Sequence, residues 1–69
     1  MHKVRIEMGF ELTDGSMRVV AGEGDNDNQV LEIIAKKIIE ACESAKKEYN
    51  KETLDVKSKW VQSREDLED

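Results

Sequence analysis

The fold is decided by the stretch VRIEMGFELTDGSMRVVAG, residues 4–22. From Val4 to Leu12, apolar side chains alternate strictly with charged residues or glycine. Such an alternation with a period of two residues is typical of a β-strand with one buried face. We therefore predict a regular strand at the start of the chain.

A turn signal follows directly after this strand. Asp14-Gly15 is a preferred pair for a two-residue hairpin turn, because both positions of that turn need positive φ. This turn would place Phe10 opposite Val19 and would leave Val20 on the outer face of the sheet. We predict a β-hairpin with this register.

After a polar connection, the spacing of apolar residues changes to three and four, as in an amphipathic helix. The helix is predicted to run from about Asp27 to Tyr49 or Asn50, with Asn26 as its N-cap and Gln29 as the capping-box partner. Its buried stripe is predicted to contain Val30, Leu31, Ile34, Ile38, Ala41, Cys42, Ala45 and Tyr49.

The last segment, Thr53–Gln62, can be read as a strand or as a helix. We favour the strand, because its Thr, Val and Trp residues suit a pleated surface and its alternation spans more residues. In this interpretation Trp60 packs on the helix, and residues 63–69 form an acidic C-terminal tail.

These elements predict a small α+β domain of type ββαβ over residues 1–62. One long helix would cover one face of a three-stranded sheet. The third strand would run parallel to the second, and a right-handed crossover past the first strand would give the strand order 2-1-3.

Composition narrows the possible functions. The chain has 69 residues with a formal net charge of -5, one Cys and one His. It can make no internal disulfide, and no Cys or His pair is present for a structural zinc, so we expect no cofactor and no metal. The start of the chain lacks the apolar run of a signal peptide or membrane span, which favours a cytoplasmic, non-membrane protein.

Three motifs suggest chemistry, but each has a structural explanation. Gly22-x-Gly24 precedes the helix as in a dinucleotide fingerprint, yet Asp27 replaces the third glycine. Asp25-x-Asp27 lacks the glycine and glutamate that a calcium loop needs further on, so helix capping explains both motifs better. Cys42 lies in the apolar stripe of the helix without a nearby base, so we expect an inert core thiol and no enzyme activity.

Binding of nucleic acid is the alternative function. The outer sheet face would carry a positive excess, since it is expected to collect Lys3, Arg5, Arg18, Lys57 and Lys59 against Glu7, Glu11 and Asp55. Sheets that bind single strands also present aromatic rings for base stacking, and the predicted strands direct Phe10 and Trp60 toward the helix. A solvated face of mixed charge is therefore the better interpretation.

Binding of another protein is the preferred function, because more apolar residues are present than one helix and one sheet face need to bury. The chain would act as an inhibitor, a subunit or a self-associating module. The predicted partner-binding positions are Arg18, Val20, Glu23, Asp25, Asp27, Ile33 and Ile39. A homodimer would form through the free edge of the second strand, residues 17–22, or through the helix.

In size and acidity, the chain is similar in kind to the small inhibitors that phages encode against host enzymes and defence complexes. That similarity implies competition for a basic nucleic-acid groove. The acidic residues available for it are Glu23, Asp25, Asp27, Glu65, Asp66, Glu68 and Asp69.

Overall fold

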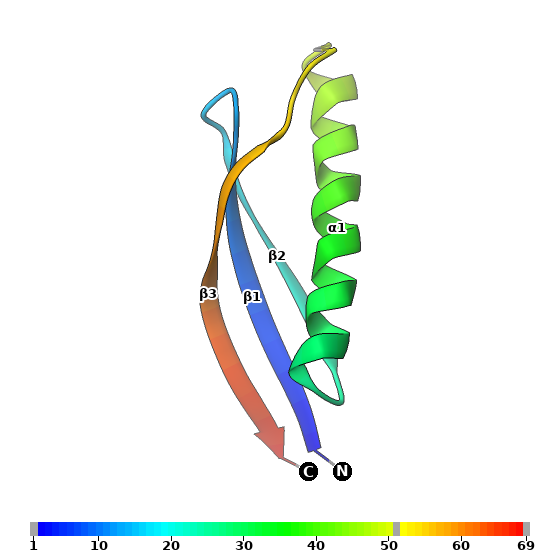
Figure 1. Ribbon diagram of the computed structural model, residues 1–69, viewed down its shortest axis with the longest axis vertical. Coiled ribbons are helices and arrows are strands. Elements are labelled where there is room, and N and C mark those ends of the chain that lie inside the picture. The colour runs from blue at the N-terminus through cyan, green and yellow to red at the C-terminus, as the bar shows by residue number, and fades with distance from the viewer. Residues whose placement is uncertain (1, 51, 69) are drawn as a thin grey trace.

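The computed structural model describes residues 2–50 and 52–68 and confirms the predicted α+β fold. Its elements are β1 (His2–Leu12), β2 (Met17–Gly24), α1 (Asp27–Glu48) and β3 (Val56–Glu68). The strands form one sheet in the order β2-β1-β3, with both outer strands antiparallel to β1. Figure 1 shows α1 running along one side of this sheet, with the two ends of the chain close together.

The core lies between α1 and the inner face of the sheet, which we define as the face toward α1. It follows the predicted alternation of β1 and most of the predicted helical stripe. Its buried members are Val4, Ile6, Met8, Phe10, Leu12, Val30, Ile34, Ile38, Cys42, Ala45 and Leu54. Apolar residues at alternate positions of β1 therefore meet helix residues spaced by three and four, as the two periodicities require.

The hairpin loop differs from the prediction by one residue. The loop has three residues, Thr13–Gly15, closed by a hydrogen bond of 2.8 Å from the Leu12 N-H to the Ser16 carbonyl. Gly15 alone takes the positive φ, +91°. Three-residue loops of this kind are a common alternative to the two-residue turn, and they also place glycine at the left-handed position.

This difference turns β2 over, because a slip of one residue moves every side chain to the other face. Phe10 pairs with Arg18 and Met8 pairs with Val20, so Arg18 and Val20 lie on the inner face rather than the outer one. Met17 and Val19 are exposed on the outer face instead.

The helix bounds agree with the prediction. The Asn26 side chain accepts a hydrogen bond of 2.9 Å from the Gln29 N-H, as an N-cap should. The Gln29 side chain accepts from the Asp25 N-H rather than from the Asn26 N-H that a strict capping box would use. At the other end, Asn50 follows the helix with φ of +53°, the left-handed position that often terminates helices.

The third strand is confirmed in type and direction, but its bounds differ. β3 begins at Val56 and continues to Glu68, so residues 63–68, expected to be a tail, pair with β1. Asp69 lies outside the described residues. The register of β3 against β1 shifts twice, between Glu7 and Met8 and between Glu11 and Leu12.

These shifts overturn the predicted position of Trp60. Trp60 pairs with Gly9 on the outer face, and 39% of its surface is exposed. A Cβ added at Gly9 would lie 2.5 Å from Cε2 of the indole, so the ring covers the space that a side chain would fill. The sequence pattern predicts Val56 and Trp60 on the same face, but the register shift near Lys57 places them on opposite faces.

Candidate functional site

An apolar groove lies between α1 and β3. It has a volume of about 300 Å³ and is lined by Met8, Leu31, Ile34, Ala35, Ile38 and Lys59. Met8 comes from β1 and Lys59 from β3, while the other four residues form the wall on α1. We call this feature the α1/β3 groove.

The groove exists because α1 packs mainly on β1 and β2. Gly22 of β2 lets the helix approach closely, since a Cβ there would lie 3.2 Å from Ile34 and 3.3 Å from Ile33. The Lys37 ammonium donates to the Ala21 carbonyl of β2. Both contacts hold α1 on the β2 side, and Figure 1 shows β3 as the strand farthest from the helix.

Large apolar side chains remain exposed around the groove. Leu31 in its wall is 41% exposed, and Ile39, one helical turn beyond Ala35, is 63% exposed. On the β3 side, Val61 pairs with Met8 and therefore faces the same way, and it is 58% exposed. The groove thus has an apolar wall and an apolar rim on both sides.

Lys59 is the charged group of the groove. It pairs with the buried Phe10 across the strands, which places it on the inner face. Among the described residues, its ammonium makes no hydrogen bond or ion pair, whereas Lys57 reaches Glu11 at 3.9 Å. The α1/β3 groove therefore offers one cation that is free to pair.

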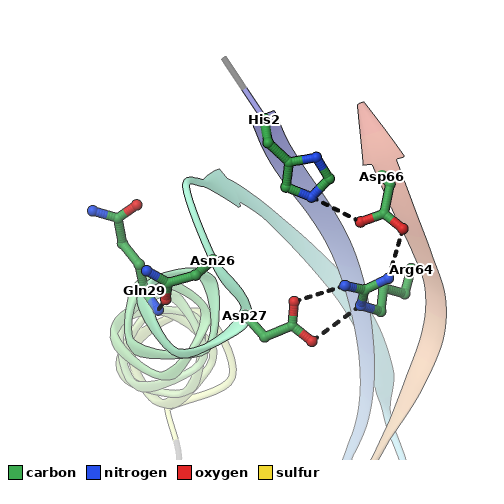
Figure 2. A network of polar contacts seen from close by, with 6 residues as sticks. All are labelled: His2, Asn26, Asp27, Gln29, Arg64 and Asp66. Atoms are coloured by element: carbon green, nitrogen blue, oxygen red, sulfur yellow. Dashed lines mark hydrogen bonds and ion pairs between the residues drawn. The ribbon is translucent and has the colours of Figure 1, made fainter. Parts of the chain in front are cut away.

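An ion-pair network joins α1 to β3 near the end where the two chain termini lie (Figure 2). The Arg64 guanidinium donates to both carboxylate oxygens of Asp27, at 2.9 and 3.0 Å, and also to Asp66 at 3.2 Å. His2 Nε2 lies 3.1 Å from the other Asp66 oxygen. Hydrogen bonding from Arg64 lowers the pKa of Asp27 below its usual value.

The predicted partner-binding residues do not gather on one surface. Val20 is half-buried against the core, and Ile33 lies over Gly22. Arg18 turns toward the end of α1, 3.5 Å from Glu48. Asp27 is engaged by Arg64 in the ion-pair network. The other three, Glu23, Asp25 and Ile39, are exposed, but only Ile39 lies close to the α1/β3 groove.

The predicted basic face is divided between the two sides of the sheet. Arg18 and Lys59 lie on the inner face, and Lys3, Arg5 and Lys57 remain on the outer face. Arg5 donates to Glu7 at 2.7 Å, and this hydrogen bond lowers the pKa of Glu7. The outer face also carries Glu7, Glu11, Glu23 and Glu65, so its described charges are not in positive excess.

Reactive groups are few in the described part of the chain. Cys42 is buried, and its thiol donates to the Leu54 carbonyl at 3.2 Å. Within residues 2–50 and 52–68, no three His, Cys, Asp or Glu side chains form a group that would hold a metal ion. Over the same residues, no helix is long and apolar enough to cross a membrane.

Sequence reasoning missed the groove, although it identified three of its wall residues, Leu31, Ile34 and Ile38, as apolar positions of the helix. A signal for the rest was present. Leu31, Ala35 and Ile39 follow one another at intervals of four, which extends the apolar surface of the helix beyond its buried stripe. Gly9 and Gly22 inside strands also mark places where another group approaches the backbone closely.

Comparison with protein-family models, with curated proteins and with solved structures gives no match for this chain.

Proposed function

We propose that this protein is a cytoplasmic, non-enzymatic binding module whose protein partner docks in the α1/β3 groove. The observation that carries the proposal is the apolar lining of the groove together with its exposed rim residues Leu31, Ile39 and Val61. Contiguous exposed apolar surface next to polar residues is characteristic of interaction sites in small proteins.

The energetics agree with this role. Burying a large aliphatic side chain contributes about 1.5 to 3 kcal/mol relative to full exposure, and the three rim residues each retain about half of that potential gain. A few residues near the centre of an interface supply most of its binding energy, and burial of these three side chains would add to that energy. The groove would serve as the anchoring site.

A photo-crosslinking residue tests the proposal directly. It is placed at Ala35 in the groove wall, and at Ser44 as a control, because Ser44 is also exposed on α1 but faces away from the groove. After irradiation in the cells from which the protein comes, we expect a discrete protein adduct from position 35 and none from position 44. Equal labelling at both positions, or no discrete adduct at position 35, would contradict the proposal.

Self-association is one form of this proposal. The β2 edge, expected from the sequence to accept a second copy, has its Ala21 carbonyl engaged by Lys37, which disfavours pairing there. Sedimentation equilibrium from 5 to 500 μM distinguishes the cases: a dimer that Ala35→Arg dissociates uses the groove, and one that only Val19→Pro dissociates uses the β2 edge. The composition of the wild-type adduct at position 35 then shows whether the partner in the groove is a second copy or a different protein.

Nucleic-acid binding through the outer face is the second candidate function. Its support is the position of Trp60, whose ring covers Gly9 on that face and is 39% exposed. Trp60 is the single tryptophan of the chain, so its fluorescence reports on this face alone. Salt-sensitive quenching by a single-stranded oligonucleotide, reduced by Arg5→Gln, would favour this candidate over protein binding.

A further inference from the structure

We propose that the segment bound in the α1/β3 groove is an amphipathic helix of the partner that carries an acidic residue opposite Lys59. This inference rests on the proposed function and specifies the shape and the charge of the bound segment. It follows from the width of the sheet, the spacing of the groove residues and the free ammonium of Lys59.

The width of the elements leaves room for one more helix. A helix with its side chains is about 10 Å wide, and neighbouring strands lie about 4.8 Å apart, so one helix covers about two strands. α1 covers β1 and β2, while the stretch of β3 with Lys59 and Val61 stays exposed on the inner face, between half-buried Val56 and the pair of Arg64 with Asp27. A second helix lying beside α1 and above β3 would complete the layer.

The wall of the groove is shaped for a helix. Leu31, Ala35, Ile38 and Ile39 follow the intervals of three and four that form ridges on a helix surface. Ala35 is the small residue in the middle of this wall, and a small residue allows two helix axes to approach to about 8 Å. Apolar side chains of the bound helix at positions i, i+3, i+4 and i+7 would then reach Met8 at the floor.

An added strand fits this surface less well. It would have to pair with the free edge of β3, which carries charges along its length and two register shifts against β1. Charged side chains and irregular register are the usual means by which edge strands avoid pairing with other strands. A helix above the inner face needs no hydrogen bond from that edge.

A second copy of α1 also fits less well. Its central apolar stripe is buried in its own core, and the apolar residues that stay exposed on it, Leu31, Ala35 and Ile39, follow intervals of four only. They form a narrower face than positions i, i+3, i+4 and i+7 provide, and the opposite side of the helix is polar. That side carries Glu32, Lys36, Glu40, Glu43 and Lys47. We therefore assign the bound helix to a different protein.

Lys59 indicates which charge the bound helix should carry. Lys59 lines the groove, and its ammonium has no partner among the described residues, so an apolar segment that covered it would desolvate it without compensation. A carboxylate at the edge of the bound helix would pair with it. Lys57 provides a matched control, since it is a nearby lysine that reaches Glu11 instead.

Selection from a random library of 16-residue peptides displayed on phage tests the inference. The wild-type protein is the bait, and an unrelated acidic protein is used for counter-selection. We expect the enriched peptides to have apolar residues at i, i+3, i+4 and i+7 with an acidic residue beside them, and to become helical on binding. Their affinity should fall at least tenfold for Ala35→Arg and less than twofold for Ser44→Arg.

Charge reversal tests the role of Lys59 with the same peptides. Lys59→Glu should weaken binding at least tenfold, and replacing the acidic residue of the peptide by Lys should restore it. Lys57→Glu should change binding less than twofold. Equal effects at the two lysines would overturn the assigned charge.

Three outcomes would overturn the inference. These are peptides with alternating apolar residues that protect the β3 edge from hydrogen exchange, binders insensitive to Ala35→Arg, and no enrichment over the counter-selected bait. A discrete foreign adduct from the photo-crosslinker at position 35 would still support the proposed function in each of these cases, so the two failures are distinguishable.

Discussion

The inner face of the sheet has two parts that differ in how they are covered. Over β1 and β2, α1 seals the surface so completely that Phe10 and Val30 have no exposed area. Beside β3, on the same face, Val61 is 58% exposed and the groove remains open. One sheet face thus carries both the core and the candidate binding site.

This difference shows how the single helix is distributed over the three strands. Close approach at Gly22 and the Lys37 contact draw α1 toward β2. Among the described residues, the polar contact that joins α1 to β3 is the pair of Asp27 and Arg64, near one end of the groove. The core is built on the β1-β2 hairpin, and β3 is held mainly through β1.

The largest effect on stability is expected in the part of the inner face that α1 covers. Phe10→Ala would remove a fully buried ring at the centre of the sheet and should lower the free energy of unfolding by about 3 to 5 kcal/mol. Urea denaturation followed by circular dichroism measures this change. A loss below about 1 kcal/mol would mean that the core does not depend on the β1-α1 contact.

The second-largest effect on stability is expected where Trp60 of β3 packs on Gly9 of β1, on the outer face. Gly9→Ala would place a Cβ 2.5 Å from Cε2 of the Trp60 indole and should cost about 1 to 3 kcal/mol, because the indole must move away. In a Trp60→Ala background, the same substitution should cost nothing. The double-mutant cycle in urea unfolding measures this coupling, and additive effects would refute the Gly9-Trp60 contact.

A smaller effect is expected at the ion-pair network that joins α1 to β3. The folded pKa of Asp27 lies below its usual 3.8, so the pair contributes stability above about pH 4 and loses it as the pH falls through the folded pKa. Wild-type stability should therefore fall more steeply below pH 4 than that of Asp27→Asn, and 1 M salt should reduce the difference. Urea unfolding from pH 7 to pH 2 measures both slopes, and parallel curves would contradict the prediction.

The smallest effect on stability is expected in the open groove. Ala35 is exposed, so Ala35→Arg should change the free energy of unfolding by less than about 0.5 kcal/mol. The same variant should abolish binding of the partner. Thermal unfolding measured beside the photo-crosslinking yield separates the two effects, and a variant that loses both stability and binding would place Ala35 in the core.

The sequence by itself determined the type and the order of the elements, although not the extent of β3. The alternation in β1, the spacing of α1 and the Asn26 cap are local patterns whose physical causes lie within a few residues. The strand order β2-β1-β3 followed from the handedness of the crossover. The apolar character of Leu31 and Ile38 was also evident, although their position in a groove was not.

Only the tertiary structure decided which face each residue of β2 and β3 takes. Asp14-Gly15 is compatible with a two-residue and with a three-residue loop. The three-residue loop places Gly22 on the inner face, where α1 approaches it closely. Register shifts in β3 turned Trp60 outward, where Gly9 leaves space for its ring. Because side chains alternate with a period of two, a register change of one residue moves every side chain of a strand to the opposite face. The local sequence does not specify the tertiary contacts that select the register.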